Sequence, residues 1–113
     1  MTKTIQQAIE AHQQGRFEEA EQIYCEILKI ETNHLDANNN MGAILYKLDR
    51  LKEAEIYYKK TIKIKPDFAA GHYNLAIILQ KLARFDEAEK SYTKAIEFKP
   101  DFFEAQSNSG NVL

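Results

Sequence analysis

GRFEEAE at residues 15–21, DRLKEAE at 49–55 and ARFDEAE at 83–89 are three copies of one segment, and 34 residues separate each copy from the next. The same spacing relates IKIKPDF at 62–68 to IEFKPDF at 96–102. A 34-residue period in a helical pattern is typical of a solenoid whose repeat is a pair of antiparallel helices. The sequence therefore predicts an all-α chain of stacked helix pairs.

The period divides the chain into three full repeats and a partial one. Counted from the first residue, these cover 1–34, 35–68, 69–102 and 103–113. A stack needs about three repeats to bury a continuous core, so we expect one domain over the whole of residues 1–113.

Turn and cap signals mark the ends of the predicted helices. Gly15 lies between the two helices of repeat one, where glycine adopts a positive φ at low cost. Pro66 and Pro100 end the second helices, because the residue before a proline is disfavoured in the α region. Asp67 and Asp101 then suit the N-cap of the next helix.

Equivalent positions carry the same residue types in successive repeats. The twenty-fourth position is tyrosine, the eighth and twentieth are small, and the thirty-second is proline in two repeats. The residues concerned are Tyr24, Tyr58 and Tyr92; Ala8, Gly42, Ala76 and Gly110; Ala20, Ala54 and Ala88; and Pro66 and Pro100. With these residues the whole chain resembles the tetratricopeptide repeat family. The resemblance implies a right-handed α-solenoid of antiparallel helix pairs, with three repeats plus the first helix of a fourth.

The fourth position departs from the family pattern. Tryptophan is usual there, and this chain has Thr4, Asn38, His72 and Gln106. We expect the departure to change the local packing and to leave the fold intact.

Composition argues against several functional classes. The net charge of −2 and a pI near 5.9 favour neither nucleic acid nor an anionic membrane as partner. No apolar run is long enough to span a bilayer, so we expect no membrane insertion. Cys25 is the only cysteine, which fits a reducing compartment, and we expect a cytoplasmic protein. His12, His34 and His72 lack ligand spacing, so we expect no metal and no cofactor.

A row of side-chain amides is the best candidate for a binding site. The sixth position of successive repeats carries Gln6, Asn40, Asn74 and Asn108. An amide donates and accepts, so such a row suits the backbone of an extended peptide. A comparable asparagine row lines the superhelix of O-linked N-acetylglucosamine transferases, and these repeats look like those arrays. The alternative is that asparagine is simply common at this position in the family.

Family geometry places further residues around the amides. The resemblance puts Ile5, Ile9, Asn39, Ala43, Tyr73 and Ile77 on the same concave wall, with His12, Tyr46, Lys47, Gln80 and Lys81 near its edge. Apolar walls with a few placed polar groups are what a peptide site needs. The alternative is that a narrow superhelix partly buries these residues without any partner.

The residues at the family's clamp positions also argue against one specific class of partner. Some family members bind the C-terminal carboxylate of heat-shock chaperones through a clamp of lysine, asparagine and arginine. The matching positions here are Ile5, Ile9, Asn40, Ala70 and Asn74, and only Asn40 fits. Without the cations a carboxylate is poorly neutralised, so we expect no capture of chaperone tails.

The two ends of the chain have different polarity. Lys3, Gln7, Glu10 and Gln14 form a polar stripe where later repeats have apolar residues, which predicts an N-terminal cap. Phe102, Phe103, Val112 and Leu113 predict apolar surface at the other end, where self-association is possible. We expect a fragment of a longer array or protein.

These observations predict a non-enzymatic protein-interaction module that holds an extended peptide or a partner helix in a concave groove. Two alternatives stay open. The chain is the substrate-recruiting arm of a larger transferase, of the glycosyltransferase or sulfotransferase type, or it is a self-assembling scaffold.

Overall fold

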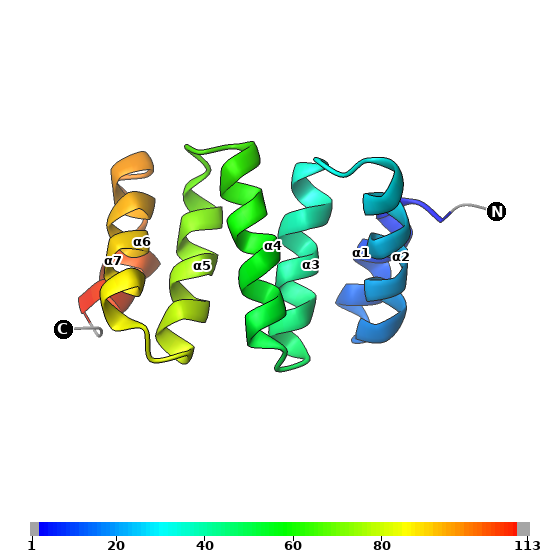
Figure 1. The fold of residues 1–113 in the computed structure, drawn as a ribbon, viewed down its shortest axis with the longest axis horizontal. Helices are drawn as coiled ribbons and strands as arrows, with labels where there is room; N and C mark the ends of the chain where they lie inside the picture. Colours follow the sequence, from blue (N-terminus) through cyan, green and yellow to red (C-terminus); the bar gives the residue numbers. More distant parts are fainter. Residues whose placement is uncertain (1–2, 111–113) are drawn as a thin grey trace. The chain divides into compact units, whose positions relative to one another are not determined.

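The computed structural model describes residues 3–110, which form helices joined by short turns (Figure 1). The described helices are α1 (Ile5–Gln13), α2 (Phe17–Ile30), α3 (Leu35–Lys47), α4 (Leu51–Ile64), α5 (Ala69–Lys81), α6 (Phe85–Phe98) and α7 (Phe103–Gly110). Each of the three full predicted repeats contributes two helices and the partial repeat contributes α7, and the expectation of an all-α chain is confirmed for the described residues. None of these helices has the length and apolarity needed to cross a membrane.

The helices belong to two compact units, whose boundary lies between Tyr57 and Tyr58, within α4. In the first unit α1 packs on α2 and α2 packs on α3. Its core contains Ala8, Ala20, Ile23, Tyr24, Met41, Ile44 and Leu45, each at most 3% exposed. In the second unit α5 packs on α6 and α6 packs on α7. Its core contains Leu75, Ala76, Ile78, Leu79, Ala88, Tyr92 and Ala95.

The tight turn inside each repeat is a Schellman motif. In repeat one the Arg16 amide donates to the Ala11 carbonyl at 2.8 Å, and the Gly15 amide donates to the His12 carbonyl at 3.1 Å. This pair of bonds satisfies carbonyls that the end of the helix would leave unpaired. The residue in the left-handed region is Gly15 at φ 77°, Asp49 at 60° and Ala83 at 61°. The prediction for Gly15 is confirmed, and the later repeats hold the same conformation without glycine.

A side chain at the fourth position of each later repeat closes the junction between repeats. Nδ2 of Asn38 donates to the Thr32 carbonyl at 3.1 Å and to the His34 carbonyl at 2.8 Å. Nε2 of His72 bonds the Pro66 carbonyl at 2.7 Å. Gln106 repeats the bond, with Nε2 donating to the Pro100 carbonyl at 2.7 Å. We call the three bonds from position four back to the carbonyl of position thirty-two, six residues earlier, the junction bonds.

The N-caps differ from the sequence prediction. Asp67 does not cap α5, because the N-cap residue is Phe68, which makes no side-chain cap bond. The Phe68 carbonyl instead accepts from the Gly71 amide at 3.0 Å. His34 is the N-cap of α3, and its Nδ1 accepts from the Ala37 amide at 3.1 Å.

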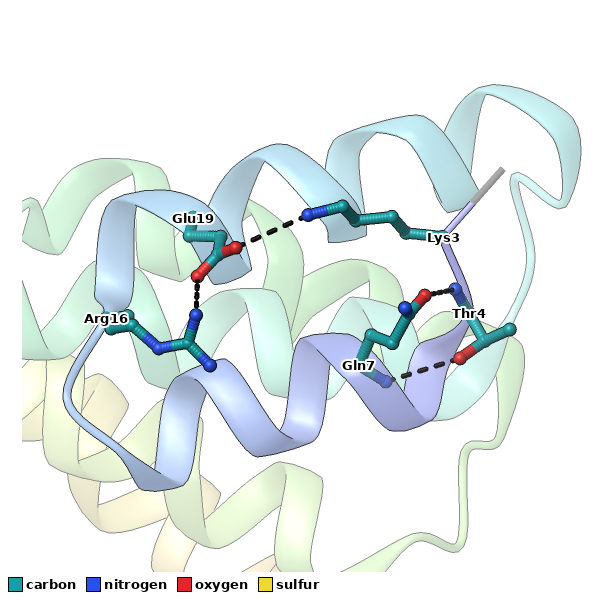
Figure 2. A network of polar contacts seen from close by, with 5 residues as sticks. All are labelled: Lys3, Thr4, Gln7, Arg16 and Glu19. Atoms are coloured by element: carbon teal, nitrogen blue, oxygen red, sulfur yellow. Dashed lines mark hydrogen bonds and ion pairs between the residues drawn. The ribbon is translucent and has the colours of Figure 1, made fainter. Parts of the chain in front are cut away.

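The first helix carries the polar features expected of a cap (Figure 2). Thr4 and Gln7 form a capping box, in which each side chain accepts from the backbone amide of the other residue. Lys3 bonds Glu19 at 3.3 Å, and Arg16 pairs with the same carboxylate. The polar stripe predicted on this helix is exposed, whereas the equivalent residues Ala37, Met41, Ile44, Gly71, Leu75 and Ile78 are buried. Among the predicted apolar residues at the other end, Val112 and Leu113 lie outside the described residues.

Candidate functional site

An open hollow of about 650 Å³ lies in the first unit and is formed by α1, α2 and α3. Its lining residues are Ile9, His12, Gln13, Gly15, Phe17, Tyr24, Asn40 and Lys47. Three of the predicted binding residues, Ile9, Asn40 and Lys47, therefore meet at one surface depression. The Schellman turn at Gly15 places Phe17 at the same rim. Ile9 and Phe17 are its apolar lining residues, and most of the others carry polar groups that can bond a ligand.

The Tyr24 hydroxyl is buried beside this hollow and has no hydrogen-bond partner of good geometry. Burial raises the pKa of Tyr24, and the Asp36 carboxylate acts in the same direction more weakly. The nearby Asn40 amide lowers this pKa, so the two side chains are close although they do not align as a hydrogen bond. The phenol therefore stays protonated, with a donor that the protein leaves unused.

His12 stands at the edge of the hollow with its ring against Phe17. The ring centroids are 5.8 Å apart at 71°, an edge-to-face arrangement. Burial lowers the pKa of His12, and the Lys47 ammonium lowers it further. Both effects disfavour the charged imidazolium, so His12 stays neutral down to a lower pH than a free histidine does.

The other predicted residues of the first unit lie apart from this lining. Ile5 contributes to a second, smaller hollow of about 200 Å³ together with Lys3, Thr4, Ile27, Ile30, Glu31 and His34. Gln6 is exposed, and Asn39, Ala43 and Tyr46 are half-buried. The structure thus gathers only part of the predicted wall of this unit into one depression.

In the second unit the predicted residues form an aromatic and amide cluster. Nδ2 of Asn108 donates to the Tyr73 hydroxyl at 3.1 Å. The Tyr73 ring lies 4.7 Å from the Phe102 ring and 6.1 Å from the Tyr92 ring. Asn74 and Ile77 are half-buried, and Lys81 is exposed. The Asn108 amide is therefore engaged with Tyr73 within the protein.

The repeated arginines at the turns are paired with nearby glutamates. Arg50 bonds Glu53 at 2.7 Å and Glu21 at 2.8 Å, and Arg84 bonds Glu87 at 2.6 Å. These ion pairs lower the pKa of Glu53 and of Glu87. The arginines therefore contribute to the surface of the fold and do not line the hollow.

The single thiol has the features of an inert side chain. Cys25 is half-buried, and burial followed by the Glu21 carboxylate raises its pKa. A raised pKa reduces the thiolate fraction that reacts at neutral pH. Among residues 3–110 no group of three or more histidine, cysteine or acidic side chains is arranged to hold a metal ion.

Sequence reasoning missed part of the lining. Phe17 was not singled out, and Tyr24 was noted only for its repeated position. A signal was available in the sequence. The twelfth position varies between repeats, as His12, Tyr46 and Gln80, whereas the twenty-fourth position is tyrosine in all three full repeats.

Family models match most of the chain. Two models described as tetratricopeptide repeat match residues 35–68, 69–102 and 4–34. The search of curated proteins gave no match.

Several solved structures share this fold. The first TPR of Spaghetti (RPAP3), bound to an HSP90 peptide, is 18% identical over 95% of this chain and 85% of that chain, with a TM-score of 0.92. The Yersinia enterocolitica type III secretion chaperone SycD, in complex with a peptide of the translocator YopD, is 19% identical over 96% and 86%, with a TM-score of 0.87. A mutant Thermobaculum terrenum O-GlcNAc transferase is 23% identical over 96% of this chain and 21% of that chain, with a TM-score of 0.88.

Proposed function

This chain belongs to the tetratricopeptide repeat family, and from that premise we propose that it is a non-catalytic interaction module that binds a peptide or a partner helix. The observation that carries the proposal is the open hollow of the first unit. Ile9, Asn40 and Lys47, three residues singled out for peptide binding, line it together. The peptide-bound RPAP3 and SycD structures support the proposal at the level of the shared fold.

The proposal assigns the main contacts to the amides of the sixth position. In the first unit Asn40 lines the hollow, and Gln6 is exposed on the preceding repeat. In the second unit Asn74 and Asn108 hold the same positions, and Asn108 must exchange its bond with Tyr73 to reach a peptide. The proposed surrounding wall consists of Ile5, Ile9, Asn39, Ala43, Tyr73 and Ile77, with Tyr46, Lys47 and Lys81 at the edge.

The amide assignment is tested with the double variant Asn40→Ala and Asn74→Ala. The probe is a pool of capped ten-residue peptides of random sequence, and the readout is the fraction retained by immobilised protein. We expect retention to fall about tenfold, because two neutral hydrogen bonds of about 0.7 kcal/mol each are lost. The matched control is Asn33→Ala, an exposed asparagine in the turn before α3.

Circular dichroism of the double variant must match the unchanged protein for the comparison to count. Retention equal to that of the unchanged protein would contradict the amide assignment. A pool that the unchanged protein does not retain at all would contradict the peptide-binding function itself.

A second candidate, self-association, rests on exposed apolar side chains of the second unit. Phe103 at the start of α7 is 70% exposed, and Phe98 at the end of α6 is 44% exposed. Exposed aromatic groups of this size favour contact with another apolar surface. Membership of a larger transferase stays an alternative, since the transferase that shares this fold is covered over only 21% of its chain.

A further inference from the structure

The hollow of the first unit contains a cation that the protein does not neutralise. Lys47 lines the hollow, and its ammonium forms no hydrogen bond or ion pair with another described residue. None of the eight lining residues is acidic. Lysines elsewhere in the described chain do find acids, as Lys3 does with Glu19 and Lys94 with Glu97. The lining of the hollow therefore holds a cation and no acidic side chain, and the carboxylate that acts on Tyr24 from nearby is Asp36.

Comparison of repeats one and three shows that an unused donor is buried at the wall of the hollow. In repeat three the Tyr92 hydroxyl donates to Oε1 of Gln80 at 2.7 Å. Tyr24 is the equivalent tyrosine of repeat one, and His12 takes the place of Gln80. The His12 ring packs on Phe17, and the Tyr24 hydroxyl stays without an acceptor. A buried donor without an acceptor is costly, so an acceptor supplied by a ligand gains that free energy back.

The two features call for the same ligand chemistry. A carboxylate carries the negative counter-charge that Lys47 lacks. It also supplies acceptor oxygens for the donors of Tyr24 and Asn40. Ile9 and Phe17 add apolar walls to this open hollow. A basic or apolar side chain would leave both the cation and the phenol unsatisfied.

We propose that this hollow binds an aspartate or glutamate side chain of the partner peptide, with Lys47 as its cation and Tyr24 and Asn40 as donors. The proposal rests on the peptide-binding function proposed above. It differs from a clamp on a terminal carboxylate, because the first-helix positions that such a clamp requires as polar or basic are Ile5 and Ile9 here.

Three pools of ten-residue peptides with acetylated N-termini test the proposal. The first has a central glutamate and an amidated C-terminus, the second has a central glutamine and an amidated C-terminus, and the third has a central glutamine and a free C-terminus. Aspartate and glutamate are left out of the other, randomised positions. We expect the protein to retain the first pool about tenfold more than the second, as one charged hydrogen bond predicts.

Lys47→Gln should abolish that preference, and Lys29→Gln is the matched control. Lys29 is exposed on α2 of the same unit, does not line the hollow, and gives the same change of net charge. Equal retention of the first two pools overturns the acidic-residue proposal while the peptide-binding function stands. If the protein retains none of the three pools, both the acidic-residue proposal and the peptide-binding function are contradicted. Preference for the third pool over the first assigns the site to a terminal carboxylate and also overturns the proposal.

His12 supplies a second readout that depends on the site itself. The titratable groups that line the hollow with His12 are Lys47 and Tyr24. A bound carboxylate opposes the effect of Lys47, so the nuclear magnetic resonance titration of the His12 ring should move to higher pH with a glutamate peptide. The matched glutamine peptide should leave the midpoint unchanged. The same midpoint with both peptides would place the carboxylate away from the hollow and contradict the proposal.

Discussion

At the scale of single residues, the turns between the two helices of each repeat differ in how well the residue at positive φ fits the backbone. Gly15, Asp49 and Ala83 all adopt a positive φ of 60° to 77°. This region costs an L-residue about 1–2 kcal/mol, and glycine avoids the cost. Ala83 has neither the freedom of glycine nor a polar side chain that stabilises this conformation locally, so the turn of repeat three carries the largest unrelieved strain of the three.

Ala83→Gly should therefore stabilise the protein. We expect the free energy of unfolding to rise by about 0.5–1 kcal/mol, because the relief of strain exceeds the added entropy of the unfolded chain. Urea denaturation followed by circular dichroism measures the change. The reverse exchange, Gly15→Ala, should destabilise by about 1 kcal/mol, although no heavy atom lies within 4 Å of the added methyl group. A loss of stability in Ala83→Gly would show that the turn is not strained.

Asn38→Ala tests the junction bonds. Asn38 is fully buried, and its amide satisfies the carbonyls of Thr32 and His34. We expect a loss of about 1–2 kcal/mol, since the buried bond to the Thr32 carbonyl is lost, although the His34 carbonyl keeps the Asn38 backbone amide as a donor and the unpaired Oδ1 of Asn38 is also removed. Thermal unfolding measures the effect, with the exposed Asn33→Ala as the matched control. Equal melting temperatures for the two variants would count against the junction bonds.

At the scale of helices, close packing depends on small side chains at one face. Ala20, Ala54 and Ala88 hold the twentieth position of their repeats, and each is 0% exposed. The Schellman turns fix where each second helix begins, and the alanines then allow that helix to approach its partner. A larger side chain at this position has no space to occupy without moving a helix.

Ala88→Leu should destabilise the second unit by about 1–3 kcal/mol through overpacking between α5 and α6. The control is Lys90→Leu, an exposed position on the same helix, where a change within about 0.5 kcal/mol is expected. Urea denaturation of both variants gives the comparison. If both lose the same amount of stability, the effect comes from the added apolar surface and not from the helix contact.

Helix order and helix type were predictable from the sequence, and the side-chain contacts were not. The recurrence of GRFEEAE at 34 residues fixes two helices per repeat, and the burial of Tyr24 and Ala20 follows from the same period. The N-cap at Phe68 was missed because a backbone carbonyl, which no residue type signals, does the capping. The junction bonds were missed because the departure from tryptophan at the fourth position was considered only as a change of local packing. The hollow depends on the rotamers of His12 and Tyr24, which periodicity does not specify.

At the scale of the whole molecule, the tetratricopeptide resemblance is confirmed by the family matches over residues 4–34, 35–68 and 69–102. The single domain over residues 1–113 stays a prediction. In repeat proteins, stability is a sum of repeat and neighbour terms. The variants proposed for the two units therefore test local contributions, and their effects should add when combined.

Self-association is the prediction that concerns the whole chain. Static light scattering should show an apparent mass that rises with concentration, and Phe103→Ser should keep the mass of one chain. Ile56→Ser removes another exposed apolar side chain, 63% exposed on α4, and should behave as the unchanged protein does. A constant mass for the unchanged protein across concentration would exclude this role.

The junction bonds have a consequence for how such a chain is inherited. Each bond joins a side chain to a carbonyl six residues earlier, so donor and acceptor are encoded within one short stretch of gene. A duplication or recombination that keeps this stretch intact copies the junction bond together with the helix that carries its donor. The donor itself is free to drift among asparagine, histidine and glutamine, since all three place an N–H at the required reach. Arrays of this type can therefore lengthen and diverge while the same bond connects each new repeat to the one before it.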